Sequence, residues 1–405
     1  MPKETERIWA GDPAGQTRKD RESFRYSAYV PDRIQDSEFP LSGPAATATA
    51  EAERALVALN ADPPTLESLE AVARQLLRAE SVASSQIEGL ELSHERLARA
   101  AWQEGDGTDQ AAQSVLGNVR AMEQAVELGE NASSLTRDHI IELHKTLMNA
   151  TRDGHLAGKV RDRQNWLGGS TFSPRGAEFV PPPPEYVDDL LTDLAAFLNR
   201  EDLPAVQQAA IAHVQFETIH PFWDGNGRVG RCLIHVVLRE RGLAPRYVPP
   251  ISLVLAARAD QYIAGLTASR SGRPLEWWLR FANVVTIAST QARGFSEKLE
   301  RLKNDWMKRA GNPRRDSATA ALIKNLPGHP IVDAKTAQAL VGGTSERSRE
   351  ALVRLEKAGV LKRLSRGNRN RVWEAADVFD VLNSFERDLA TPDGASDPAL
   401  PVPAA

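Results

Sequence analysis

Residues 220–231 (HPFWDGNGRVGR) bring together the residue types that phosphate chemistry needs. The glycines and asparagine at 225–227 predict a tight turn, and a helix beginning near Arg228 would direct its unpaired backbone N–H groups at that turn. Free N–H donors and the positive end of a helix dipole together attract anions. The turn therefore predicts a binding site for phosphate groups.

The charged residues of this segment extend the prediction. Arg228 and Arg231 lie three residues apart on one helix face, where their guanidinium groups can bind further phosphate oxygens. Asp224 supplies a carboxylate that suits Mg²⁺, an ion that usually completes its shell with phosphate and water. His220 can accept a proton at neutral pH, which makes it the candidate general base. We expect a hydroxyl to attack a phosphate of a Mg²⁺-bound nucleotide, without the GxxxxGK(S/T) loop of P-loop enzymes.

The same residues resemble a family signature. Residues 220–231 are similar to the Fic-domain signature HPFx(D/E)GNGRxxR at every specified position. The resemblance implies a helical fold and the transfer of AMP from ATP to a Ser, Thr or Tyr hydroxyl of a protein. It implies the following roles: His220 as base, Asp224 as Mg²⁺ ligand, Phe222 as loop anchor, Gly225, Asn226 and Gly227 as anion hole, and Arg228 and Arg231 as distal phosphate ligands. The family's phosphotransfer branch has Lys in place of Gly227, so the glycine favours nucleotidyl transfer.

Two further segments extend the resemblance, which covers roughly residues 30 to 300. Residues 158–184 interrupt the helical period with Gly pairs and a Pro run, which predicts a β-hairpin flap. This flap resembles the family's hairpin over the active site, whose exposed edge would pair with a target protein by strand addition. Its candidate nucleotide contacts are Asn165, Trp166, Leu167 and Gly168.

Two other residues are candidates for the nucleotide pocket. Residues 260–262 resemble a family segment that contributes to the adenine pocket, which implicates Tyr262, although Gln261 stands where a Tyr is commoner. Gln215 precedes the candidate base by five residues on the same predicted helix. It would contact either the nucleotide or the surrounding protein.

Residues 84–89 (SSQIEG) resemble the inhibitory motif (S/T)xxxE(G/N), which precedes the Fic core in autoinhibited members. Ser84 and Glu88 are four residues apart and share one helix face. A Glu88 carboxylate that reaches Arg231 would occupy the site of the γ-phosphate, and ATP would then bind with its α-phosphate misaligned. The resemblance therefore assigns regulatory roles to Ser84 and Glu88, whereas the plain alternative is a solvated carboxylate at a helix end.

The periodicity of apolar residues predicts the elements that position these groups. Spacings of three and four predict a long amphipathic helix from about residue 65 to 89, stopped by Gly89. Further helices are predicted at about 92–103, 110–129, 137–149, 185–199, 205–217 and 228–241, and a charged helix ends near Arg309. The fold class is therefore mainly α, a Fic-type helical bundle with a β-hairpin flap and a C-terminal winged helix domain.

Composition and length set the domain organisation. The chain has 405 residues, 41% of them hydrophobic, with 50 Lys and Arg against 54 Asp and Glu, which is typical of globular proteins. We expect a flexible tail at 1–30, a helical region at 31–110, a catalytic domain at 111–310, a winged helix domain at 316–388 and a flexible tail at 389–405. One cysteine, Cys232, and the lack of an apolar run of about 18 residues predict a cytoplasmic protein without membrane contact.

The C-terminal region contains a positively charged stretch that the net charge of the whole chain conceals. Helices, a turn at 342–343 and a hairpin with its turn near 366–368 follow the order of a winged helix-turn-helix. Between Val341 and Trp373 there are nine Lys or Arg against three Glu, a net charge of +6. Arg347 and Arg349 would reach DNA. Winged helices also form dimer or protein contacts, so DNA, a homodimer or another protein partner stay open.

Three functions compete at this point. The first is an autoinhibited protein adenylyltransferase that uses ATP and Mg²⁺. The second is a DNA-binding transcriptional regulator whose Fic core senses nucleotide, although sensing requires no base at His220. The third is a de-AMPylating hydrolase of the same fold, in which Glu88 directs water.

Overall fold

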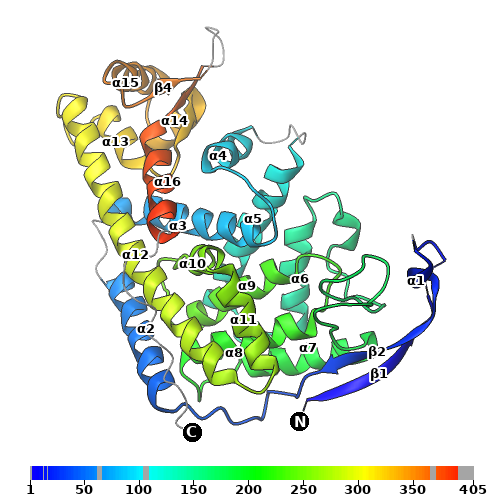
Figure 1. Ribbon diagram of the computed structural model, residues 1–405. Coiled ribbons are helices and arrows are strands. Elements are labelled where there is room, and N and C mark those ends of the chain that lie inside the picture. Colours follow the sequence, from blue (N-terminus) through cyan, green and yellow to red (C-terminus); the bar gives the residue numbers. More distant parts are fainter. Residues whose placement is uncertain are drawn as a thin grey trace.

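The computed structural model describes residues 2–11, 13–15, 17–61, 66–103, 109–364 and 371–390. The fold is mainly helical, as the periodicity predicts (Figure 1). The helices up to residue 309 are α1 (Arg18–Arg21), α2 (Gly43–Ala61), α3 (Leu66–Ile87), α4 (His94–Trp102), α5 (Gln110–Asn131), α6 (Arg137–Met148), α7 (Pro184–Leu198), α8 (Ala205–Ile219), α9 (Asn226–Glu240), α10 (Ile251–Ala257), α11 (Ala259–Arg270) and α12 (Pro274–Arg309). A short 3₁₀ helix spans Gly154–Leu156.

Local signals explain where several helices begin and end. Helix α3 ends before Gly89, whose φ of 77° is strained for any residue with a side chain. Helix α6 begins with a capping box between Thr136 and His139. The periodicity does not predict α2, because its apolar residues are mostly alanines. It packs along α12 in Figure 1.

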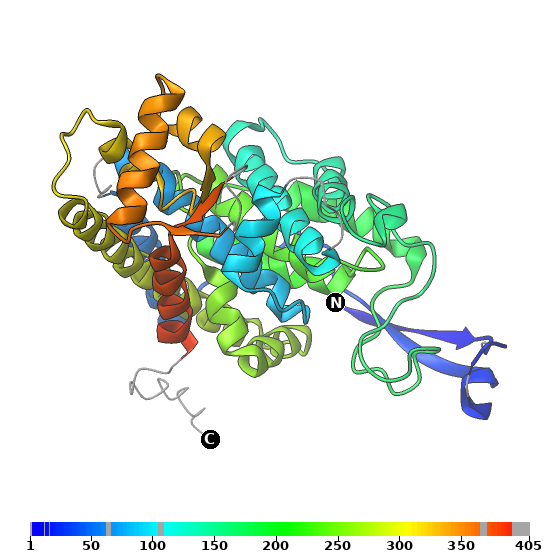
Figure 2. The same cartoon turned by 90° about the horizontal axis from the view of Figure 1, so that it is seen from above.

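The predicted flexible tail at residues 1–30 is wrong. Strands β1 (Lys3–Trp9) and β2 (Phe24–Val30) pair antiparallel with Trp9 opposite Phe24, and we call this pair the N-terminal ribbon. The less exposed face of β2 carries Phe24, Tyr26, Ala28 and Val30, and the Trp9 ring meets that of Trp166 edge-on at 5.3 Å. The polar β1 sequence conceals this strand, which the flap and β2 stabilise. Figure 2 shows the ribbon extending away from the helices.

The C-terminal module (residues 316–390) combines helices with a small sheet. Its elements are α13 (Ala318–Asn325), β3 (Ile331–Asp333), α14 (Ala334–Val341), α15 (Ser345–Lys357), β4 (Lys362–Arg363), β5 (Val372–Glu374) and α16 (Ala376–Ala390). The sheet is antiparallel in the order β3-β5-β4. The predicted turn near 366–368 lies outside the described residues. Helix α16 includes the first two residues of the tail predicted at 389–405, and the rest of that tail is outside the described residues as well.

One apolar core connects the module to the helices around α8 and α9. Trp277 and Trp306, both on α12, are completely buried in it. Polar contacts add to the connection, since Gln75 Nε2 of α3 donates to the Pro327 carbonyl at 2.6 Å. Helix α12 therefore serves as a common spine, with the module at its far end (Figures 1 and 2). Among the helices of the described residues, none combines the length and apolarity of a membrane span.

Candidate active site

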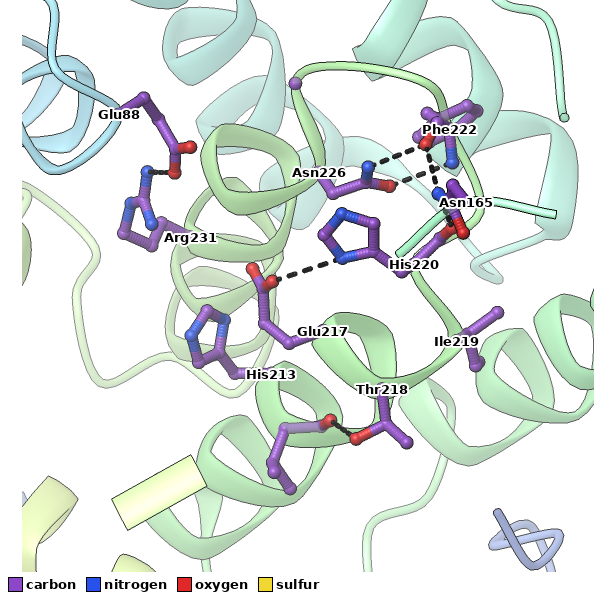
Figure 3. Close-up of polar contacts among 12 residues, drawn as sticks. Glu88, Asn165, His213, Glu217, Thr218, Ile219, His220, Phe222, Asn226 and Arg231 are labelled. Atoms are coloured by element: carbon purple, nitrogen blue, oxygen red, sulfur yellow. Dashed lines mark hydrogen bonds and ion pairs between the residues drawn. The ribbon is translucent and has the colours of Figure 1, made fainter. Parts of the chain in front are cut away.

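The loop between α8 and α9 holds His220 in an uncommon backbone conformation. His220 caps the C-terminus of α8 with φ 48° and ψ 61°, in the left-handed region. Its carbonyl oxygen accepts hydrogen bonds from Arg161 Nε at 2.9 Å and from Asn165 Nδ2 at 3.2 Å. Both side chains come from the flap (residues 158–184), so the flap fixes the backbone of the candidate base (Figure 3).

Asn226 closes the loop through its side chain. The Phe222 N–H donates to Asn226 Oδ1 at 2.9 Å, and Asn226 Nδ2 donates back to the Phe222 carbonyl at 2.8 Å. The Phe222 ring is fully buried and stacks on His144, with ring centroids 3.7 Å apart. The Asn226 carboxamide is therefore engaged within the loop, and its backbone N–H is the group left to bind an anion.

The first turn of α9 supplies hydrogen-bond donors. Gly225 precedes it with φ 79°, and a Cβ there would lie 2.9 Å from the Leu147 side chain. The Val229 N–H makes the first bond of the helix, to the Gly225 carbonyl at 3.0 Å. Among the described residues no side chain caps this end, so the N–H groups of residues 226–228 lack helical partners. This turn has the geometry of an anion site.

Arg231 is buried beneath the end of α3. Its Nε donates to Ser84 Oγ at 2.8 Å, and its Nη2 donates to the Ser84 carbonyl and to Glu88 Oε1, both at 2.7 Å. The same Glu88 oxygen also lies over the first turn of α9, because a Cβ added to Gly227 would come within 1.9 Å of it. The Glu88 carboxylate thus covers both Arg231 and the candidate anion site (Figure 3).

Arg228 and Asp224 form a second, more exposed pair. Arg228 Nη1 donates to Ser114 Oγ at 3.0 Å, and its Nη2 donates to Asp224 Oδ2 at 3.1 Å. The Asp224 side chain is 52% exposed. One accessible carboxylate beside a phosphate site fits Mg²⁺, which takes few protein ligands. Among the described residues no cluster of three His, Cys, Asp or Glu could hold a metal by itself.

The surroundings of His220 keep its imidazole neutral. Burial, together with the positive charges of Arg270 and Arg161, lowers the pKa of His220 to about 4. A neutral ring at pH 7 is the form that accepts a proton. Glu217, three residues earlier on α8, places its Oε2 3.8 Å from His220 Nδ1. Burial raises the pKa of Glu217 to about 7.

Two family models match the chain over the helices just described. The Fic/DOC family model matches residues 134–238, and the Fic/DOC family N-terminal model matches residues 46–127. The chain is thus similar to the Fic/DOC family over these two ranges. The first range contains residues 220–231 and the second contains Glu88, so the contact between Glu88 and Arg231 joins the two matched regions.

Relatives of known name share parts of the chain. The protein adenylyltransferase fic-1 of Caenorhabditis briggsae is 34% identical over 171 residues, which are 40% of this chain and 30% of the relative. A probable protein adenylyltransferase of Aquifex aeolicus is 39% identical over 98 residues, 24% of this chain and 28% of the relative. The chain thus spans less than a third of the length of these relatives. The crystal structure of a Fic family protein from Desulfovibrio desulfuricans G20 is similar in fold, with a TM-score of 0.52 and 21% identity over 83% of this chain and 97% of that chain.

Two other predicted residues lie at the edge of the candidate site. The Tyr262 hydroxyl pairs with His213 Nε2 at 2.8 Å, and burial raises the pKa of Tyr262, which the positive charge of Arg231 opposes. Gln215 donates to the Asp32 carbonyl at 2.9 Å. Tyr262 therefore borders Arg231, whereas the described contact of Gln215 is with the segment that follows the N-terminal ribbon.

The flap is less regular than a hairpin of two strands. Leu167 and Phe179 form an isolated antiparallel bridge, and Gly168 follows with φ 71°. Trp166 Nε1 donates to the Ser170 carbonyl at 2.6 Å. The Tyr29 N–H of the N-terminal ribbon donates to the Val180 carbonyl at 2.9 Å, so the ribbon covers one side of the flap.

Several residues that shape the site are absent from the sequence predictions. Arg161 holds the His220 carbonyl, and His144 both stacks on Phe222 and lies 3.1 Å, through Nε2, from the Asp224 carbonyl. Arg270 donates to Thr218 Oγ1 at 3.2 Å in the last turn of α8. Glu217 is also absent from these predictions, although it lies only three positions before His220 in the sequence.

Proposed function

We propose that this protein transfers AMP from ATP to a hydroxyl group of a protein side chain. The observation that carries the proposal is the juxtaposition of a neutral histidine, His220, with the unpaired N–H groups of α9 and the buried Arg231. Similarity to the Fic/DOC family implies a nucleotide substrate, and the relatives described above are named as adenylyltransferases. Gly227 supports nucleotidyl transfer, since it occupies the position of the Lys in the phosphotransfer branch.

The residues suggest a simple sequence of steps. His220 accepts the proton of the target hydroxyl, whose oxygen attacks the α-phosphorus of ATP while the bond to pyrophosphate breaks. The N–H groups of residues 226–228 stabilise the charge on the phosphoryl oxygens, and Arg228 and Arg231 orient the departing phosphates. Asp224 would hold Mg²⁺, which supplies charge neutralisation for the polyphosphate when bound.

We also propose that Glu88 inhibits the transfer. Its Oε1 accepts a hydrogen bond from Arg231 Nη2 at 2.7 Å and lies where a phosphate would approach Gly227. A nucleotide must either displace this carboxylate or bind in a different pose. Ser84, which accepts a hydrogen bond from Arg231 Nε, holds the guanidinium in place from the same helix.

The target protein would bind along the flap. Because the N-terminal ribbon covers the Val180 side, an added strand would pair along residues 165–168. The C-terminal module is proposed as a winged helix, with Arg347 and Arg349 exposed on α15 as candidate contacts to DNA, although a protein partner or a second copy of the chain would suit the same surface.

Intact-mass analysis tests these proposals together. The wild-type protein, His220→Ala and Glu88→Gly are incubated with ATP and Mg²⁺, alone and with a cell extract. An AMP-sized addition that requires His220 and increases in Glu88→Gly supports the adenylyltransferase. No addition in any form, together with salt-dependent DNA binding, would instead favour the regulator. Removal of AMP from a modified protein by wild type but not by Glu88→Gly would favour the hydrolase.

A further inference from the structure

We propose that Glu217 is the positioning residue of His220, orienting its imidazole and stabilising the imidazolium that forms when His220 takes the proton of the target hydroxyl. This inference rests on the proposed function. It assigns a role to a buried carboxylate that the signature residues 220–231 do not include.

The geometry places the two side chains as a pair. Glu217 lies on the last turn of α8, and its Oε2 is 3.8 Å from His220 Nδ1 (Figure 3). Their side chains are only 9% and 14% exposed. Neither His220 Nδ1 nor Glu217 Oε1 has a hydrogen-bond partner among the described residues. Since buried polar atoms are normally paired, a small rotation of the ring would bring Nδ1 into hydrogen-bonding distance of Glu217 Oε2 and leave Nε2 for the target hydroxyl.

Neighbouring elements keep the Glu217 carboxylate in this position. A Cβ on Gly230 of α9 would lie 2.8 Å from Glu217 Oε1, so the glycine leaves the room that the carboxylate needs. On the other side, Arg270 Nη2 donates to the Glu217 carbonyl at 3.2 Å. The backbone and the side chain of Glu217 are thus held from two different helices.

The charge of Glu217 depends on the inhibitory residue. Burial raises the pKa of Glu217 to about 7, Arg231 and Arg270 oppose this shift, and the negative charge of Glu88 adds to it. Glu88→Gly removes this like charge, so we expect a lower pKa for Glu217 in that variant without nucleotide. The variant therefore favours the carboxylate form that His220 needs.

The charged groups around His220 determine how readily its imidazole accepts a proton. When the target O–H bond breaks, the proton moves to His220 Nε2, the oxygen bonds to the α-phosphorus and pyrophosphate leaves. The imidazolium then faces Arg270 and Arg161, both positive, while Glu88 is displaced by the nucleotide. Among the charged residues described around the ring, Glu217 remains as the anion that offsets these two arginines.

The test uses Glu217→Gln in the Glu88→Gly background with ATP and a target protein. We expect kcat to fall 10- to 100-fold while KM for ATP changes less than about twofold. The acidic limb of the pH profile should move to lower pH, because removing the anion lowers the pKa of His220. Glu217→Asp, which keeps a carboxylate, should retain the original limb. Asp193→Asn removes a buried carboxylate that accepts the Ile34 N–H, and it should change neither quantity.

A second measurement separates this inference from the proposed function. The imidazole of His220 is titrated by NMR in Glu88→Gly and in the double variant, without nucleotide. A lower pKa in Glu217→Gln supports the pairing even if no AMP transfer is found, in which case the proposed function alone fails. An unchanged His220 pKa overturns the inference, as does an unchanged pH profile with full kcat.

Discussion

Helix α3 and the turn that follows it contact the core through two glutamates, Glu80 and Glu88, and the two contacts differ in kind. At Glu80 the carboxylate is completely buried, with Oε1 2.9 Å from His235 Nε2 on α9 and Oε2 accepting the Ser252 N–H of α10 at 2.7 Å. At Glu88 the carboxylate has Arg231 as its described hydrogen-bond partner, and its side chain is 34% exposed. Glu88 follows Glu80 by eight residues, about two helical turns.

Under the proposed inhibition, this difference separates an anchoring contact at Glu80 from a regulatory contact at Glu88. Removing one member of a buried pair leaves the other without a partner and without water, which lowers the free energy of unfolding by about 3–5 kcal/mol. A partly exposed pair contributes only about 0–1 kcal/mol to stability. A phosphate can replace the Glu88 carboxylate on Arg231 and on the α9 turn. Because Glu80 is completely buried, a phosphate cannot reach it in the same way. We therefore expect inhibition to be released at the last turn while the body of α3 stays in place.

The largest effect on AMP transfer should come from the partly exposed contact between Glu88 and Arg231. Glu88→Gly should raise AMP transfer by one to a few powers of ten, each power corresponding to about 1.4 kcal/mol of barrier. The unfolding midpoint should move little, because Glu88 follows the end of α3 and its pair is partly exposed. Labelled ATP and thermal unfolding measure the two quantities. Equal transfer by wild type and variant would break the comparison at its regulatory end.

The buried contact should show the opposite behaviour. Glu80→Ala leaves His235 and Ser252 unpaired in the core, so the free energy of unfolding should fall by about 3–5 kcal/mol. Denaturant titration measures this. Glu70→Ala on the same helix removes a carboxylate that is 80% exposed and paired with Arg74, and it should cost no more than about 1 kcal/mol. Similar losses in the two variants would contradict the assignment of Glu80 as an anchor.

The two contacts also differ in how far the sequence predicts them. Residues 220–231 are contiguous, so a local pattern already contains the turn, the helix start and the candidate base. Glu88 is predictable because its motif has a fixed spacing from Ser84. Glu80 meets partners 155 and 172 residues away. A buried glutamate on a helix has the same local pattern as a solvated one, so only the packed structure distinguishes them.

Other elements that the sequence does not predict also depend on partners that are distant in the chain. The N-terminal ribbon is stabilised by the flap, through Trp166 and Val180, and the polar sequence of β1 does not predict a strand. Strand β3 spans only Ile331–Asp333 and depends on pairing with β5. The helices, in contrast, follow from periodicity within each segment. The helices that periodicity predicts were therefore placed to within a few residues, whereas α2 and the strands β1, β2 and β3 were not predicted.

Acid should weaken the region around Arg231. Burial first, and then the positive charge of Arg231, lowers the pKa of His213 to about 3. Below pH 6.5 the unfolded chain binds a proton that the folded chain does not, so stability falls as the pH drops from 6.5 toward 3. The loss should reach about 2 kcal/mol at pH 5. Denaturant titrations at pH 7 and pH 5 should show a smaller loss in His213→Gln, and equal losses would refute this origin.

The smallest effect on transfer should come from Ser84, which lies between the two contacts. If Glu80 keeps α3 in place, the bond from Arg231 Nε to Ser84 Oγ persists in the inhibited and the active state alike. Ser84→Ala should then cost about 1 kcal/mol of stability but change transfer less than about threefold, in wild type and in Glu88→Gly. Steady-state assays with labelled ATP measure both backgrounds. An increase near that of Glu88→Gly would show instead that the end of α3 lifts as a unit, so that Ser84 and Glu88 leave Arg231 together.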